Sequence, residues 1–242
     1  MENHYKAILL VLASNNSPVY KQFKKVYQSY LYENSNIKVL FVYGKCDLYH
    51  RMDYDLVFDD IEENYYPGMI TKTIRAFEYI NQNYTYDFLI RTNLSTFWDF
   101  ERLVKRLDTL STINCLTGTL RNCVYKVQKS PQYISGVDLI LSSNLVEQLV
   151  NNQHEVCSWD LPEDWALSQF FINVGLLPTP SYPGAIHIIE KLSIFDKQTV
   201  LQEIELAKKK NHDHFRLKNK NRDIDIKIAK ILLKEYYGKT LL

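Results

Sequence analysis

Short runs of apolar residues alternate with amphipathic stretches along the first half of this chain. Three of the runs are bounded by polar or turn residues, which is typical of strands buried on both faces. They occupy residues 7–13, 37–43 and 86–91, and a shorter run occupies 55–58. This alternation predicts an α/β fold with a mostly parallel central sheet and helices on both faces. The three longer runs should be neighbouring parallel strands of that sheet.

Helices are expected between and beyond these strands. The first covers residues 19–32, and the second begins at Pro67, whose missing N–H is harmless at a helix start. Ile70, Ile74 and Phe77 give the second helix an apolar stripe. The remaining pattern predicts two strands, at 124–127 and 132–135, and four helices, at 144–152, 162–171, 199–210 and 224–237. A polar, basic segment at 211–223 separates the last two helices, so the C-terminal part is expected to be helical and basic.

Polar residues follow three of the predicted strands directly. They are Ser14-Asn15-Asn16, Gly44-Lys45 and Arg91-Thr92-Asn93. Ligands of open α/β sheets bind at the carboxyl ends of the strands. We therefore expect these residues to share one rim, and a binding site to lie there.

The charge of the chain is balanced overall but uneven along its length. The formal net charge is +1, which argues against a general nucleic-acid binder. Residues 203–242 carry eleven Lys and Arg against six Asp and Glu, a local balance of +5. A cationic C-terminal segment beside a mildly acidic body favours one local site for an anion.

Composition also limits the compartment and the chemistry. The four cysteines (Cys46, Cys115, Cys123 and Cys157) are widely spaced, which fits reduced thiols better than a zinc site or disulfides. The longest apolar run, 7–13, is too short to cross a bilayer, so no membrane span is expected. Eighteen tyrosines and only seven glycines fit an AT-rich viral or bacterial genome. We expect a cytoplasmic protein, in the host cytoplasm if it is viral.

Three segments, taken in order, resemble the β1,3-galactosyltransferase and Fringe-like glycosyltransferases. The first contains Asp55-Leu56-Val57-Phe58-Asp59-Asp60, Tyr66-Pro67-Gly68-Met69-Ile70-Thr71-Lys72-Thr73 and Tyr86-Asp87-Phe88-Leu89-Ile90-Arg91-Thr92. The second is Tyr133-Ile134-Ser135-Gly136-Val137-Asp138-Leu139-Ile140-Leu141-Ser142, and the third is Pro162-Glu163-Asp164-Trp165. The resemblance covers roughly residues 6–175 and implies the nucleotide-sugar-binding fold called GT-A. It implies one domain over 1–242, with a nucleotide-binding half (1–100), an acceptor half (101–200) and a basic helical tail (201–242).

The resemblance implies that Asp164 is the catalytic base, with Glu163 as a helper. Transfer of a sugar to a hydroxyl needs a base to accept the hydroxyl proton, and a carboxylate can serve. The alternative for Asp164 is a structural carboxylate that complements the dipole at a helix start. The alternative for Glu163 is a helix cap.

This chain departs from the resembled family at its metal-binding triplet. Three acidic residues of the family hold a divalent cation, whereas this chain has Asn93-Leu94-Ser95. Amide and hydroxyl oxygens are weak ligands for Mn²⁺ or Mg²⁺ compared with carboxylates, so no metal ligand is assigned. Asp99 and the Asp59-Asp60 pair are the nearest alternative carboxylates.

Without a metal, the charge of a departing diphosphate must be met by Lys or Arg. The segment from His212 to Arg222 is the best source, and a solvated basic loop is its alternative. The pair His212-x-His214 has no matched third ligand, which argues against zinc. The small pair Ser135-Gly136 would let the backbone approach a sugar closely. The residues expected to bind the donor are Ser14, Lys72, Arg91, Thr92, Asn93, Ser95, Ser135, Gly136, His214, Arg216 and Lys218.

The resemblance therefore predicts an inverting glycosyltransferase that uses a UDP-sugar donor and a glycan or glycoconjugate acceptor, and the missing acidic triplet favours a metal-independent reaction. Two other functions stay open at this point. One is a catalytically inactive relative that binds a sugar nucleotide or glycan, as loss of the acidic triplet would suggest. The other is a nucleic-acid-binding protein that uses the basic segment at 208–222 for phosphate contacts.

Overall fold

The computed structural model describes residues 4–46, 51–122, 124–125, 128–129, 132–180 and 185–241. The predicted strand at 124–127 lies partly outside these residues, and Cys123 lies outside them entirely. No helix in the described part of the chain is long and apolar enough to cross a membrane.

The centre of the molecule is a seven-stranded sheet in the order β12-β6-β11-β4-β1-β2-β3. Its strands are β1 (His4–Leu12), β2 (Ile37–Tyr43), β3 (Asp55–Val57), β4 (Thr85–Asn93), β6 (Leu116–Gly118), β11 (Leu139–Ser142) and β12 (Thr179–Pro180). The strands β3, β2, β1 and β4 run parallel, and β11 is antiparallel to both β4 and β6. The predicted α/β class and the three neighbouring parallel strands are both confirmed.

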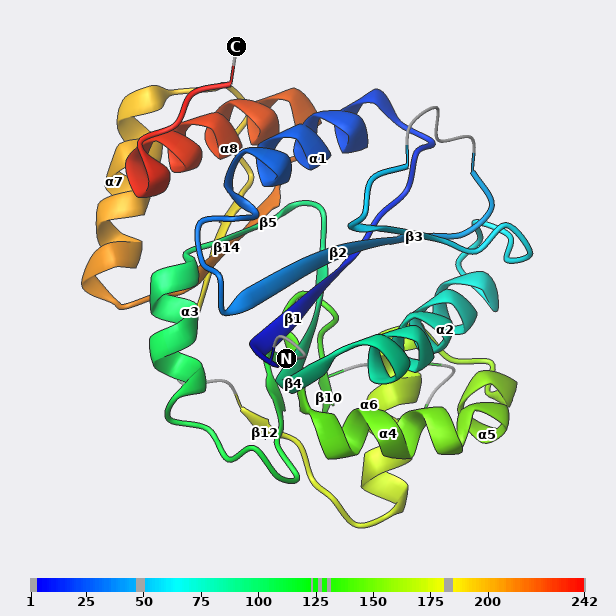
Figure 1. Cartoon of the computed structure of the whole chain (residues 1–242). Helices are drawn as coiled ribbons and strands as arrows, with labels where there is room; N and C mark the ends of the chain where they lie inside the picture. The colour runs from blue at the N-terminus through cyan, green and yellow to red at the C-terminus, as the bar shows by residue number, and fades with distance from the viewer. Residues whose placement is uncertain are drawn as a thin grey trace.

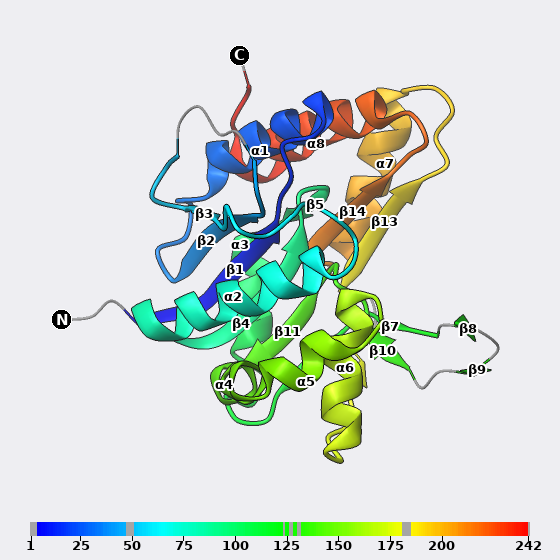
Figure 2. The same cartoon turned by 90° about the vertical axis from the view of Figure 1, so that its right-hand side faces the viewer.

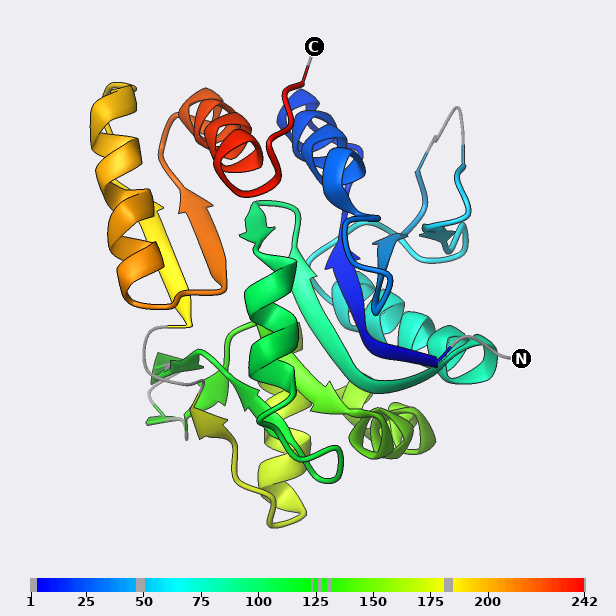
Figure 3. The same cartoon turned by 60° about the vertical axis from the view of Figure 1, so that its left-hand side comes forward.

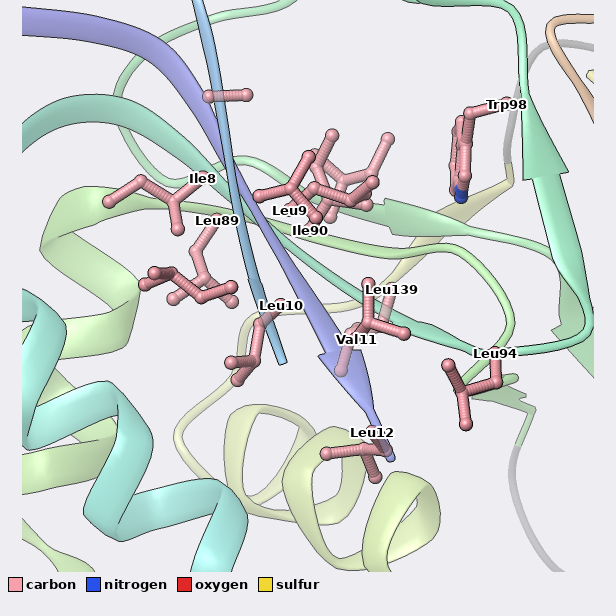
Figure 4. Close-up of a cluster of buried hydrophobic side chains, with 14 of the residues drawn as sticks. Ile8, Leu9, Leu10, Val11, Leu12, Leu89, Ile90, Leu94, Trp98 and Leu139 are labelled. Carbon is pink, nitrogen blue, oxygen red and sulfur yellow. The ribbon is translucent and has the colours of Figure 1, made fainter. Parts of the chain in front are cut away.

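The core of the sheet is formed by β1 and β4. Every residue of β1 from Ala7 to Val11 is fully buried, because helices cover both faces of this strand. Figure 4 shows side chains of β1, β4 and β11 gathered there, including Leu9, Ile90 and Leu139, with Trp98 beside them. This burial explains why the strands are continuous apolar runs instead of alternating patterns.

Helices lie on both sides of the central sheet. They are α1 (Pro18–Tyr30), α2 (Gly68–Asn83), α3 (Phe100–Leu107), α4 (Ser143–Asn151), α5 (Gln153–Ser158), α6 (Glu163–Asn173), α7 (Lys197–Lys209) and α8 (Arg222–Tyr237). The helices α1 and α8 pack side by side on one side, and α2, α4 and α5 lie on the other (Figures 1 and 2). As expected, α2 follows Pro67 directly and buries Ile70, Ile74 and Phe77.

A second sheet, which the sequence pattern does not reveal, joins two strands of the C-terminal part to one strand from the middle of the chain. Its order is β13-β14-β5, with β5 (Thr96–Trp98), β13 (Ile186–Glu190) and β14 (His214–Lys218). Figure 3 shows β13 in yellow and β14 in orange beside the gold helix α7, with the red helix α8 next to the blue α1. The segment 211–223 is thus not a solvated basic loop, because its middle pairs with a strand on each side.

The remaining strands form two small hairpins. They are β7 (Leu120–Arg121) with β10 (Tyr133–Ile134), and β8 (Val124–Tyr125) with β9 (Gln128–Lys129). Strand β10 matches the prediction at 132–135. The loop that follows it, 135–138, approaches the end of β4 and becomes part of the candidate site.

Candidate functional site

Two adjoining cavities lie at the carboxyl ends of β1 and β4. The cavity nearer β1 has a volume of about 480 Å³, and the cavity nearer α6 has a volume of about 440 Å³. We call them the β1 cavity and the α6 cavity. Both are lined by Tyr65, Met69, Asn93 and Arg216, so they form one cleft. The cleft therefore lies at the predicted rim, where it is lined by Ser14, Asn16, Arg91 and Asn93.

Most of the residues predicted from sequence line this cleft. The β1 cavity includes Ser14, Lys72, Asn93, Ser95 and Arg216. The α6 cavity includes Arg91, Asn93, Ser135, Gly136, Glu163, Asp164, Arg216 and Lys218. Residues that lie far apart in the sequence thus meet in one place, although their individual contacts differ from expectation in several cases.

Asp164 is a half-buried carboxylate on the first turn of α6. Its Oδ2 accepts a hydrogen bond from the backbone N–H of Gly136 at 2.9 Å, and its Oδ1 accepts one from the N–H of Trp165 at 3.1 Å. No basic side chain pairs with it among the ion pairs of the described residues. A carboxylate held by neutral donors at the wall of a cavity keeps lone pairs available to accept a proton.

Glu163, the neighbour of Asp164, is held in a buried ion pair. Its carboxylate accepts hydrogen bonds from Arg91 Nε at 3.0 Å and Nη2 at 2.5 Å, and its Oε1 also accepts one from Thr73 at 3.1 Å. Burial raises the pKa of Glu163, and the Arg91 charge opposes this. The charges of Glu163 and Arg91 therefore neutralise each other, and the catalytic role of Glu163 and the donor-binding role of Arg91 stay predictions.

Position 136 requires a glycine. A side chain carbon at this position would collide with the guanidinium of Arg91. The Gly136 carbonyl accepts hydrogen bonds from Arg91 Nη1 and from Asn93 Nδ2. The close approach expected of this glycine therefore exists, but its partner is Arg91.

Arg216 is one of three cations of the C-terminal segment that line the cleft, together with Lys218 and Arg222. Strand β14 brings Arg216 to the end of β4, where its Nη1 donates to Ser95 Oγ at 2.6 Å. Burial, together with the nearby positive charges of Arg222 and Arg91, lowers the pKa of Arg216 to about 10. Arg216 therefore stays protonated at neutral pH in a position where an anion would relieve the repulsion.

Lys72 lines the cleft but is already neutralised. Its ammonium donates to both oxygens of Glu63, at 2.9 and 2.8 Å, and to the carbonyl of Ala13 at 3.1 Å. Glu63 also accepts a hydrogen bond from the N–H of Gly44 at 2.6 Å. The positive charge of Lys72 is thus compensated by Glu63, and the contacts of the two side chains connect α2 to the ends of β1 and β2.

Thr92 and His214 do not reach the cleft, contrary to the prediction. Thr92 is fully buried and donates to the carbonyl of Val137 at 2.6 Å. His214 is fully buried beneath Trp98, with ring centroids 4.2 Å apart, and lies 2.5 Å from Asp213. Both residues support the walls of the site because their strands turn these side chains inward.

The residues at the expected metal position do not suit a divalent cation. Asn93 is hydrogen-bonded to Arg91 and Gly136, and Ser95 faces the positive charge of Arg216. The alternative carboxylates are paired elsewhere: Asp99 with Arg102, Asp59 with Arg51 and Asp60 with Arg75. Within the described ranges, no group of three or more His, Cys, Asp or Glu side chains comes together.

His212 lies outside the cleft, and its surroundings predict that the stability of the fold depends on pH. Its Nδ1 is 3.1 Å from Nδ1 of His187, and burial with the adjacent His187 and Lys210 charges lowers its pKa to about 4. A histidine in the unfolded chain titrates near ~6.5. The stability that neutral His212 provides is therefore complete above this value and is lost as the pH falls toward 4.

We expect the thermal unfolding midpoint to decrease when the pH is lowered from 7.5 to 4.5, and this decrease to be smaller in His212→Asn. The asparagine keeps a polar atom near the position of Nδ1 but cannot take up the proton. The exposed His154→Asn is the control and should leave the pH profile unchanged. A His212→Asn profile identical to that of the wild type would contradict this assignment.

Several residues of the cleft were not predicted from the sequence. Tyr20, Glu63 and Tyr65 line the β1 cavity, and Arg121 and Glu190 line the α6 cavity. The signal for Glu63 was its spacing of nine residues before Lys72, across the start of a helix. Arg121 and Glu190 had no such signal, because their positions depend on strand pairings that are remote in sequence.

Comparisons with known proteins find a remote structural similarity. The sequence matches no protein-family model and no curated protein. Among solved structures, the apo form of mouse xyloside xylosyltransferase 1 is similar to this chain with a TM-score of 0.45 and 9% sequence identity. The likeness covers 88% of this chain and 97% of that one. It is too remote to assign a function.

Proposed function

We propose that this protein is a glycosyltransferase that moves a sugar from a nucleoside diphosphate to an acceptor hydroxyl with inversion, using UDP-sugars as donors. The observation that carries the proposal is the placement of Asp164 and Arg216 on one cleft at the carboxyl ends of parallel strands. A proton acceptor and an uncompensated cation are the two groups that this reaction requires.

In the proposed reaction, the acceptor oxygen forms a bond to the anomeric carbon while the bond from that carbon to the diphosphate breaks. The acceptor proton passes to Asp164, and the electron pair of the breaking bond leaves on the diphosphate. Arg216 stabilises that developing charge. Attack on the face opposite the leaving group inverts the anomeric carbon.

The arginines of the chain support this assignment of Arg216. Eight arginines occur in the sequence, and all lie in the described part. Six of them form ion pairs with carboxylates: Arg51, Arg75, Arg91, Arg102, Arg106 and Arg222. Arg121 and Arg216 form none with the described carboxylates, and both line the α6 cavity. An anionic ligand would complete the charge balance there.

The basic segment does not favour a nucleic-acid-binding function. His212 and His214 are buried, and Arg216 faces the cleft from a strand paired on both sides. The basic side chains of this segment that are exposed are Lys209, Lys210, Lys218 and Lys220, a smaller set for phosphate contacts than the sequence offers.

The proposal is tested by calorimetric titration with UDP in the presence of EDTA. Arg216→Ala is expected to weaken UDP binding by about 1.5–3 kcal/mol, because hydrogen bonds to charged groups have this strength. The control is Arg75→Ala, which removes a partly exposed arginine paired with Asp60 outside the cleft. Hydrolysis of a UDP-sugar panel with Mn²⁺ or with EDTA completes the test.

Binding of UDP that persists in EDTA and weakens only in Arg216→Ala supports the proposal. Binding that vanishes in EDTA and is unaffected by Arg216→Ala would overturn the role of Arg216. Stabilisation by oligonucleotides and not by nucleotides would overturn the proposed function as a whole. A catalytically inactive binder would bind UDP and turn over no donor.

A further inference from the structure

The guanidinium of Arg91 joins three parts of the chain at the floor of the α6 cavity. Arg91 belongs to β4 and is 4% exposed, and its partner Glu163 on α6 is 3% exposed. Two of its nitrogens bind Glu163, and Nη1 donates to the carbonyl of Gly136 and to Asn93 Oδ1, the latter at 3.1 Å. All of these contacts are buried or partly buried, so water competes with them weakly.

The loop at Gly136 connects Arg91 to the predicted base. On one side, the carbonyl of Gly136 is held by Arg91 and Asn93. On the other side, its N–H donates to Asp164 Oδ2 at 2.9 Å. The loop is fastened a second time by the bond from Thr92 to the carbonyl of Val137. One glycine is thus held by β4 and in turn holds the carboxylate of Asp164.

We propose that Arg91 is a positioning residue for Asp164, acting through Glu163 and Gly136. This inference rests on the proposed function and deepens it. Arg91 fixes the loop through Gly136 and fixes the first turn of α6 through Glu163, so the two sides of the Asp164 environment share one anchor. A displacement of a reacting group by about 1 Å can cost two orders of magnitude in rate.

The geometry requires a guanidinium at this position. Glu163 takes two nitrogens of a planar fork, and a third nitrogen is then directed at Gly136. The single ammonium of a lysine can neutralise Glu163 but cannot also hold the loop. Arg91→Lys therefore keeps the buried charge balance and removes the contact to Gly136.

The first experiment measures the loop directly and needs no substrate. The chain has seven glycines, so ¹⁵N-glycine labelling gives a spectrum with few signals, and added carbonyl-¹³C-serine labelling assigns Gly136, because Ser135-Gly136 is the one Ser-Gly pair in the sequence. In Arg91→Lys, amide exchange at Gly136 is expected to accelerate at least tenfold. The amide of Gly44 is the internal control, because it also donates to a carboxylate, that of Glu63.

The matched variant is Arg106→Lys. Arg106 is partly buried, with its side chain 9% exposed, and is also paired with a buried carboxylate, Asp213, but it does not line the cleft. It should lose stability comparably and leave the exchange of Gly136 unchanged. If Arg91→Lys does not fold, Arg91→Met/Glu163→Leu replaces the ion pair with apolar groups of similar size and is measured in the same way.

The second experiment measures turnover of a UDP-sugar. Arg91→Lys is expected to lower kcat at least tenfold while KM for the donor changes by less than twofold. Unchanged exchange at Gly136 in a folded Arg91 variant would overturn the proposal, as would unchanged kcat. If the wild type turns over no UDP-sugar, the proposed function fails, whereas the exchange measurement still decides whether Arg91 holds the loop.

Discussion

Asp164→Asn is expected to lower kcat by roughly 10²-fold or more, because a general base contributes that much to a proton transfer. Asparagine has nearly the same shape but cannot accept the proton of an acceptor hydroxyl. It can still accept the hydrogen bond from the N–H of Gly136 through its amide oxygen, so the loop should stay in place. The measurement is steady-state turnover of a UDP-sugar with acceptor, alongside calorimetric titration with UDP.

The affinity for UDP shows whether Asp164→Asn has lost only the catalytic base or has a damaged binding site. Because Asp164 acts on the acceptor, UDP should bind Asp164→Asn within twofold of the wild type. Glu190→Gln is the matched control, since it removes an exposed carboxylate from the same cavity without touching α6. Wild-type turnover in Asp164→Asn would remove Asp164 from the mechanism.

The parallel half of the fold could be predicted from the sequence because its strands are buried on both faces. The run at 37–43 matches β2 residue for residue. The second sheet could not be predicted in the same way. Strand β14 reads His-Phe-Arg-Leu-Lys, and its polar positions resemble a solvated loop until pairing with β13 and β5 places them.

The position of the site could be predicted more fully than the role of each residue. Strand ends, the order of the motifs and the charge of the C-terminal segment predicted Ser14, Asn93, Asp164 and Arg216, and all four line one cleft. Whether a charged side chain is available there depends on its partner, and partners such as Glu63 for Lys72 come from tertiary packing. Local sequence carries little of that information.

Glu163→Leu is expected to lower the free energy of unfolding by about 3–5 kcal/mol, the usual cost of leaving one partner of a buried ion pair without the other. Arg91 would keep a positive charge in a nearly inaccessible position, 2.5 Å from where the carboxylate was. Denaturant unfolding measures the loss. Asp59→Leu, which breaks an ion pair between largely exposed side chains, should leave the unfolding midpoint unchanged.

The double variant Arg91→Met/Glu163→Leu should recover most of that stability, since an apolar pair of similar volume can replace a buried ion pair at little cost. Transfer should nevertheless stay low, because the double variant loses the Arg91 contact to the carbonyl of Gly136 and leaves Asn93 alone to hold it. The double variant would then be stable but poorly active, which distinguishes the structural role of this residue pair from its role in transfer. If stability and turnover recover together, the pair only fills space, and Asp164 is positioned by its own backbone contacts alone.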